Sequence, residues 1–117
     1  MRYMLLIYTD ESLGATMTEE EGNAIMAAYY AYSNEVVAAG VNLSSEALYP
    51  ASQAKTVRVR NGKMIVTDGP FAETKEQLGG FYALQCKDLD EAILWAGKCP
   101  GIKDAPIEIR PIAEHEA

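Results

Sequence analysis

The sequence predicts a mixed α+β domain built around one sheet. Two segments repeat apolar side chains at helical spacing, and several shorter segments alternate apolar and polar residues or are rich in β-branched and aromatic residues, as strands are. A third observation is Asn61-Gly62, which is typical of a tight hairpin turn because both central residues of that turn need positive φ. The length of 117 residues suits one domain, taken as residues 1–117.

The N-terminal part is predicted to form a strand followed by a long helix. Residues 2–9 are rich in Leu, Ile and Tyr, which favours a strand. Thr18 and Glu21 form a capping box that begins a helix over residues 19–39. Gly40 ends this helix, because glycine enters the left-handed conformation at little cost. The apolar stripe of the helix comprises Ile25, Tyr29, Tyr32 and Val36.

The middle of the chain is predicted to form three short strands. Residues 41–49 form an irregular strand, residues 54–60 alternate as a half-buried strand does, and residues 64–67 return as its hairpin partner. We expect Val57 and Val59 on the covered side of this hairpin. The basic residues Lys55, Arg58 and Arg60 would then form a solvated face.

The C-terminal part is predicted to add a strand, a second helix and a closing strand. Residues 68–78 are expected to be a loop, and residues 80–86 the strand that follows it. Asp88 caps a helix that ends at Pro100-Gly101, and residues 106–112 alternate as a closing strand. The inward stripe of this helix is expected to comprise Leu89, Ala92, Ile93 and Ala96.

Without the hairpin, this order is βαββαβ, the ferredoxin-like split βαβ arrangement. In that fold both helices cover one face of the sheet, so the other face needs a partner if it is apolar. We therefore expect a homodimer, a dimeric α+β barrel with a pocket near the strand ends. The residues expected on the uncovered face are Met4, Leu6, Tyr8, Tyr82, Leu84 and Ile112.

Composition argues against several classes of function. The net charge of −7 disfavours a nucleic-acid partner, and no apolar run reaches the ~20 residues of a membrane helix. These features suit a cytoplasmic protein. Cys86 and Cys99 are expected to be reduced core thiols, and the single histidine, His115, leaves no ligand set for a Cys/His zinc site. No cofactor-binding motif is evident, so we expect no cofactor.

Residues 68–82 hold most of the ionisable candidates. Asp68 or Glu73 could act as an acid or base if an apolar pocket raised its pKa, and Lys75 could orient an anionic substrate. The alternatives are a turn-making role for Asp68 and a solvated charge cluster of Glu73, Lys75 and Glu76. Asp68, Glu73 and Glu76 could in principle hold a divalent ion, but the segment does not match a recognised ion-binding loop.

Four further residues are candidates for contacting a substrate. Tyr8 and Tyr82 could supply phenol donors or simply pack in the core, and Phe71 could line a pocket or cap the core. Arg110 could clamp an anion or pair with Glu108. The pair Gly79-Gly80 either lets a ligand or a second backbone approach closely or forms a β-bulge.

Residues 68–81 read Asp-Gly-Pro-Phe-Ala-Glu-Thr-Lys-Glu-Gln-Leu-Gly-Gly-Phe, which resembles the signature of the DGPF-domain proteins, a branch of the YCII-related superfamily. Residues 3–8, 56–58, 88–92 and 107–112 also match. The resemblance implies a ferredoxin-like dimeric α+β barrel. It implies less about activity: YCII relatives are suspected enzymes because of a His-Asp pair that this sequence cannot form with His115 in its tail. Their frequent proximity to sigma-factor genes suggests a regulatory role instead.

The sequence thus predicts a protein that binds an unknown small molecule in a dimer-associated pocket. If it is catalytic, it would be a cofactor-independent enzyme with Asp68 or Glu73 as the acid or base. Its substrate contacts would be Tyr8, Phe71, Lys75, Glu76, Tyr82 and Arg110. The alternatives are a non-catalytic interaction or sensor module linked to transcription, and a structural dimer lock formed by residues 68–81.

Overall fold

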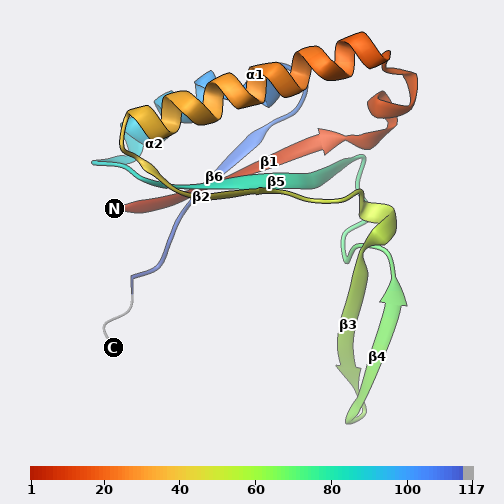
Figure 1. Ribbon diagram of the computed structural model, residues 1–117. Coiled ribbons are helices and arrows are strands. Elements are labelled where there is room, and N and C mark those ends of the chain that lie inside the picture. Colours follow the sequence, from red (N-terminus) through yellow and green to blue (C-terminus); the bar gives the residue numbers. More distant parts are fainter. Residues whose placement is uncertain (115–117) are drawn as a thin grey trace.

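The computed structural model describes residues 1–114 and follows the order expected from the sequence (Figure 1). Its elements are β1 (Arg2–Asp10), α1 (Glu19–Ala38), β2 (Asn42–Ala47), β3 (Lys55–Arg60), β4 (Lys63–Asp68), β5 (Glu76–Gln85), α2 (Leu89–Lys98) and β6 (Ile107–Pro111). Short 3-10 turns span Glu11–Thr16, Ala51–Gln53 and Pro100–Lys103. Neither helix has the length and apolar character that crossing a bilayer would require in the part of the chain described.

The main sheet has the strand order β2-β5-β1-β6, and each neighbouring pair is antiparallel. Without the β3–β4 hairpin this is the ferredoxin-like order, so the predicted α+β, split βαβ fold is confirmed for the single chain, and the dimeric barrel stays a prediction. Both helices lie over the same face of the sheet, and no helix covers the other face (Figure 1). We call that second face the open face.

Local sequence signals account for where the elements begin and end. The Thr18 side chain accepts the Glu21 amide and the Glu21 carboxylate accepts the Thr18 amide, so the predicted capping box begins α1. Gly40 has φ of 74°, which ends the helix as expected. Asn61 and Gly62 have φ of 53° and 74°, the two positive values that a type I′ turn needs.

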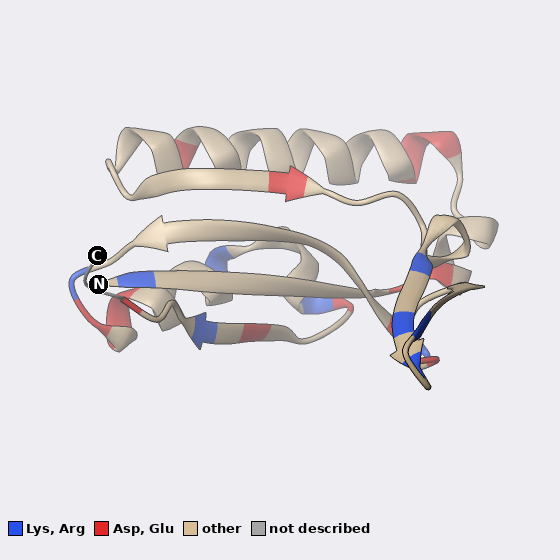
Figure 2. Ribbon diagram, turned by 90° about the horizontal axis from the view of Figure 1, so that it is seen from below, with Lys and Arg blue, Asp and Glu red and all other residues tan. Residues whose placement is uncertain are grey.

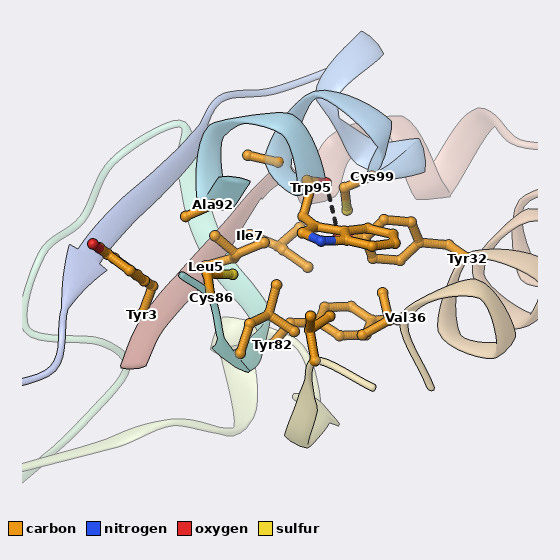
Figure 3. Close-up of a cluster of buried hydrophobic side chains, with 13 residues drawn as sticks. Tyr3, Leu5, Ile7, Tyr32, Val36, Tyr82, Cys86, Ala92, Trp95 and Cys99 are labelled. Carbon is orange, nitrogen blue, oxygen red and sulfur yellow. Dashed lines mark hydrogen bonds between the residues drawn. The ribbon is translucent and has the colours of Figure 1, made fainter. Parts of the chain in front are cut away.

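The hydrophobic core lies between the helices and the sheet (Figure 3). Its buried residues are Tyr3, Leu5, Ile7, Tyr32, Val36, Val41, Tyr82, Leu84, Cys86, Ala92, Trp95, Ala96 and Cys99. The Tyr32 hydroxyl donates to the Trp95 carbonyl oxygen at 2.8 Å. The Tyr32 ring also meets the Tyr82 ring edge-on at 5.1 Å, so α1 is fixed to both α2 and β5.

The expectation for the open face was right for β1 and wrong for β5. Leu5 pairs with Tyr82 and Tyr3 with Leu84, which places Tyr82 and Leu84 on the helix side of the sheet. The register shifts between Ile7 and Tyr8, so that Gly79 is an extra residue in β5. The bulge lies before the predicted strand of residues 80–86, whose own alternation is regular. That alternation does not show which side turns toward the helices; the pairing of Leu5 with Tyr82 decides it, and a shift of one residue would exchange the two faces.

The stripe predicted for α2 was wrong at two of its four positions. Ala92 and Ala96 are buried as expected, together with Trp95, whereas Leu89 and Ile93 are exposed. The bulky Trp95 ring is the side chain that joins α2 to the core. An exposed Leu or Ile on a short helix is common, because folded proteins keep much apolar surface in water.

Two expectations for the middle of the chain also need correction. The loop predicted over residues 68–78 is shorter, since β4 extends to Asp68 and β5 begins at Glu76. Val57 and Val59 are exposed rather than covered. The reason is that β3 and β4 pair only with each other and project from the body of the molecule on the side of the open face (Figure 1). We call residues 55–68 the arm.

Candidate ligand-binding site

A cavity of about 400 Å³ lies between α1 and the helix-facing side of the sheet. Ile7 and Thr9 of β1, Tyr29 of α1 and Tyr82 of β5 line it together with β2 residues. Its volume is within the usual range for small-molecule sites, which are mostly apolar with a few polar groups. We call it the helix cavity. Its full lining is Ile7, Thr9, Tyr29, Ser45, Glu46, Ala47, Gly79, Gly80, Phe81 and Tyr82.

A second cavity, of about 410 Å³, lies beside the first and shares Ile7, Thr9 and Tyr29 with it. It lies between the beginning of α1 and the turns Glu11–Thr16 and Pro100–Lys103. We call it the N-terminal cavity. Tyr29 therefore stands in the wall between two adjacent hollows.

The cavities form because only the second half of α1 is tightly packed. Tyr32 and Val36 are buried in the core, whereas earlier on the same stripe Tyr29, one turn before Tyr32, is half-buried and Ile25, two turns before it, is exposed. The stripe predicted from the sequence is therefore correct, but no bulky side chain fills the space below its first half. Gly79 and Gly80 lie on the sheet side of the helix cavity and add no side-chain volume.

The Tyr29 hydroxyl is the most distinctive polar group of these cavities. The Cys99 thiol donates to its oxygen, with 3.9 Å between sulfur and oxygen. Burial, followed by the nearby Cys99 thiol, raises the pKa of Tyr29, so the phenol is neutral at physiological pH. Among residues 1–114, the only candidate acceptor for the Tyr29 proton within hydrogen-bond distance is this same sulfur, and a thiol sulfur is a weak acceptor. Tyr29 can therefore donate to a ligand.

The position of Tyr29 depends on Gly101. A Cβ built on Gly101 would overlap the Tyr29 hydroxyl oxygen. The turn Pro100–Lys103 thus needs glycine at this position to leave room for the phenol. Burial also raises the pKa of Cys99, so its thiol stays protonated and remains a donor.

A third, more open hollow of about 540 Å³ borders the segment that holds most of the predicted site residues. Glu73 and Lys75 line it on one side and Asp10 and Glu11 on the other. We call it the loop hollow. It shares Asp10 and Glu11 with the N-terminal cavity, so the three hollows form a series along the end of β1.

The loop hollow has well-ordered acidic groups on its β1 side. The Asp10 side chain is 13% exposed, accepts from the Ser12 hydroxyl and amide, and lies 3.7 Å from Lys75 Nζ. The Ser12 hydroxyl is the main reason that the pKa of Asp10 is lowered, and Lys75 adds to the shift. The Glu11 carboxylate accepts the Ala51 amide at 2.9 and 3.2 Å. The lowered pKa keeps Asp10 ionised, and backbone amides hold both carboxylates in place.

Three predicted site residues line none of these cavities, and two of them, Asp68 and Phe71, lie at the arm. Asp68 pairs with Lys55 across the arm and is well exposed. Phe71 is also exposed, and its ring centroid lies 5.7 Å from the guanidinium carbon of Arg58. Glu76 is exposed at the beginning of β5, opposite Asp10 in the register.

The remaining predicted residues lie on opposite sides of the sheet. On the open face, the Tyr8 hydroxyl donates to Glu108 at 3.1 Å, and Arg110 donates to the other Glu108 oxygen at 3.5 Å. The hydrogen bond from Tyr8 to Glu108 is the main cause of the raised pKa of Tyr8. On the helix side, Tyr82 shares a 2.6 Å hydrogen bond with Ser33 and lines the helix cavity.

The structure thus brings Glu73 and Lys75 together at the loop hollow and separates them from Tyr8, Tyr82 and Arg110. Within residues 1–114, no group of three or more His, Cys, Asp or Glu side chains is arranged to hold a metal ion. His115 lies outside the described residues.

From the sequence, Tyr29 was expected to be a structural core residue, and the position of its hydroxyl group in the wall of two cavities was not predicted. The apolar stripe of α1 correctly predicted which helix face turns toward the sheet. It could not show that a cavity separates Tyr29 from the sheet. Gly101 was interpreted only as a helix stop. No pattern in the sequence links it to a residue more than seventy positions earlier.

The fold and the cavities define a small α+β protein with a ligand-sized space beneath its first helix. The chain belongs to the YCII-related family, because the model of the YCII-related domain matches residues 1–116. The resemblance drawn from residues 68–81 is confirmed at this level.

Two known proteins are similar over nearly the whole chain. An uncharacterised protein of Rhizobium meliloti is 40% identical over 115 residues, which are 97% of this chain and 93% of that protein. A solved structure of 5-chloro-2-hydroxyhydroquinone dehydrochlorinase (TftG) from Burkholderia phenoliruptrix, in complex with 2,5-dihydroxybenzoquinone, matches with a TM-score of 0.55 at 15% identity. That match covers 98% of this chain and 96% of the other, and it supports the fold.

Proposed function

We propose that this protein binds a small, largely apolar organic molecule in the helix cavity and holds it by a hydrogen bond from Tyr29. The observation that carries the proposal is the half-buried, neutral Tyr29 hydroxyl, whose only candidate acceptor among residues 1–114 is the weakly accepting Cys99 sulfur at 3.9 Å. A buried polar group normally has its hydrogen bonds satisfied. A ligand oxygen would supply the missing acceptor.

The cavity also indicates the chemistry of the ligand. Its walls are mainly apolar, with Thr9 and Ser45 as further hydroxyl groups. A neutral phenol donor suits a carbonyl or quinone oxygen, and the apolar walls suit a planar ring. No cationic side chain lines the helix cavity, so a strongly anionic ligand would be poorly compensated.

The structural neighbour supplies a suitable probe. TftG is a dehydrochlorinase whose solved complex contains 2,5-dihydroxybenzoquinone, a planar ring with carbonyl and hydroxyl oxygens. At 15% identity this likeness does not assign a substrate to the present chain. It does make the same compound a rational first ligand for a cavity with one free phenol donor.

The test compares two adjacent tyrosines. Tyr29→Phe removes the donor and keeps the ring, whereas Tyr30→Phe makes the same change on an exposed side chain. We expect wild type and Tyr30→Phe to bind 2,5-dihydroxybenzoquinone or hydroquinone equally in calorimetric titrations. Tyr29→Phe should bind about tenfold more weakly, the usual effect of one lost hydrogen bond. Equal affinity of the two variants, or no binding of either compound by wild type, would contradict the proposal.

We further propose that the protein is a cofactor-independent enzyme in which Glu73 and Asp68 transfer protons at the rim of the loop hollow. The support is that Glu73 and Lys75 border that hollow, next to the ionised Asp10. Asp68 stands apart in its pair with Lys55. The variants Glu73→Gln and Asp68→Asn separate the two roles: a turnover lost only in Glu73→Gln assigns the chemistry to Glu73, and turnover kept in both removes both residues from it.

A non-catalytic interaction module is the second candidate. The observation that favours it is the arm, whose exposed apolar side chains are suited to a protein contact. A cytoplasmic location belongs to the same proposal, and it is supported by two cysteines that are free and buried rather than paired.

A further inference from the structure

The arm carries three bases on one of its two faces. Arg60 lies directly opposite Lys63 in the register, and Arg58, two residues before Arg60 on β3, has its side chain on the same side. Lys55 lies on the other face, with the exposed valines of the arm, and pairs there with Asp68. We call Arg58, Arg60 and Lys63 the basic face.

The basic face has no negative charge beside it within the arm. Residues 56–67 contain no acid, and Figure 2 shows bases along both strands of the arm. None of the three bases takes part in an ion pair within residues 1–114. Like charges directly opposite each other destabilise a strand pair, so the arrangement of Arg60 and Lys63 is unfavourable unless an anion lies between them.

Arg58 is held in place before any ligand arrives. Its side chain is half-buried, its Nε atom is buried without a hydrogen-bond partner, and the Phe71 ring centroid lies 5.7 Å from its guanidinium carbon. On the same face, the Thr56 hydroxyl donates to the Gly69 carbonyl oxygen at 2.8 Å and ties the segment before Phe71 to the arm. A guanidinium that is already held loses little side-chain entropy on binding, and its planar fork suits phosphate oxygens.

The charge distribution of the chain indicates a compact anion. The arm has four bases and one acid, whereas the rest of the chain has six bases and sixteen acids. A long polyanion would extend from the arm over this acidic body and be repelled by it, whereas one phosphate group fits within the basic face. A phosphate monoester carries about 1.5–2 negative charges at neutral pH, which three cations can compensate.

Phe71 adds an aromatic surface beside these charges. Its side chain is 81% exposed although its ring lies next to the Arg58 guanidinium. A ring of the ligand that stacks on Phe71 would cover this surface. The ligand that suits both features is therefore a phosphate ester of an aromatic ring.

We propose that the basic face binds the phosphate group of a small aromatic phosphate ester, whose ring packs against Phe71. None of Arg58, Arg60, Lys63 and Phe71 lines the helix cavity or the other two hollows, so this site is separate from the proposed ligand site beside Tyr29. It also stays open if the valine face of the arm is covered, because the bases point the opposite way.

The test follows backbone amide shifts by heteronuclear NMR while phenyl phosphate is added. Arg58→Gln removes a charge from the basic face, and Lys55→Gln makes the same change on the other face of the same arm. Wild type and Lys55→Gln should have equal dissociation constants, and Arg58→Gln should bind about tenfold more weakly. The amides that shift in wild type should be those of residues 56–67 and 69–71.

Phe71→Leu separates the contribution of the ring from that of the charges. It should weaken binding of phenyl phosphate several-fold and leave binding of inorganic phosphate unchanged, because inorganic phosphate has no ring to stack. The amide spectrum of the main sheet, which does not contain the arm, shows whether each variant is folded. If Arg58→Gln fails to fold, Arg60→Gln tests the same face at an exposed position.

Equal affinity of the folded Arg58→Gln and Lys55→Gln variants for phenyl phosphate would overturn the proposal. So would wild-type shifts that do not saturate, or that lie outside the arm and residues 69–71. Binding to anionic phospholipid vesicles without any binding of phenyl phosphate would also overturn it, because the ligand would then be a membrane surface.

Discussion

Gly101 leaves open the space that the Tyr29 hydroxyl occupies. The two residues come from the turn after α2 and from the first half of α1, and a side chain at position 101 would overlap the phenol oxygen. Since Tyr29 lines both cavities beneath α1, the absence of a side chain at one position sets the geometry of the proposed ligand site.

Gly101→Ala should therefore displace Tyr29. Overpacking of this kind costs about 1–3 kcal/mol of unfolding free energy, which urea denaturation measures, and binding of 2,5-dihydroxybenzoquinone should weaken as well. Gly97→Ala is the matched control, because a Cβ at Gly97 meets nothing within 4 Å. Gly97 lies in the last turn of α2, so this change should leave the protein as stable as wild type or stabilise it by up to about 0.5 kcal/mol. If Gly101→Ala were as stable as Gly97→Ala, the close approach of Tyr29 and Gly101 would not exist in solution.

The unfolding free energy should fall as the pH rises from 9 to 11. Burial, helped by the nearby Glu91, raises the pKa of the Cys86 thiol from 9.0 to about 11. The unfolded chain then loses this proton before the folded chain does, so the stabilisation is complete below pH 9 and is lost as the pH passes 11. The loss attributable to Cys86 is about 2–3 kcal/mol.

Urea denaturation at several pH values measures this dependence. Cys86→Ala should give a shallower slope between pH 9 and 11, whatever its stability at neutral pH. Parallel curves for the variant and wild type would show that the thiol is not responsible. Tyr29 and Tyr32, whose pKa values burial also raises, act in the same direction at higher pH in both proteins.

Asp10 should hold the segment of residues 69–75 in place. Its carboxylate accepts from Ser12 and lies near Lys75, so it joins the end of β1 to that segment. Asp10→Asn should make the segment more mobile, and trypsin should then cut after Lys75 several-fold faster than in wild type. Asp68→Asn is the comparison, because Asp68 pairs only with Lys55 on the arm. Equal cleavage rates in the two variants would exclude this role for Asp10.

The sequence was most informative where a local pattern determines a local conformation. The capping box of Thr18 and Glu21, the helix stop at Gly40 and the turn at Asn61 were all predicted correctly, because each depends on a few neighbouring residues. The order of elements and the fold class followed from these signals. Both proposed roles of Gly79-Gly80 are present: Gly79 forms the bulge, and a Cβ on Gly80 would lie 2.8 Å from the Glu46 carbonyl oxygen.

The sequence was least informative where position depends on distant contacts. Tyr82 and Leu84 were assigned to the wrong face because the alternation of residues 80–86 does not show which side faces the helices, which the long-range pairing with β1 determines. Val57 and Val59 have the pattern of a half-buried strand, yet the body of the chain does not reach them. Asp68 and Glu73 are close in sequence, but Glu73 borders the loop hollow whereas Asp68 pairs with Lys55 on the arm.

The junction of the arm with the body is closed by two short hydrogen bonds. The Gly69 amide donates to the Ala54 carbonyl and the Thr56 hydroxyl donates to the Gly69 carbonyl, both at 2.8 Å. These bonds fix where the arm leaves the domain regardless of how far it extends. Natural insertions, deletions or substitutions within the hairpin are therefore expected to leave the two cavities beneath α1 unchanged, because none of residues 55–68 lines them, so the two parts of the protein can diverge independently.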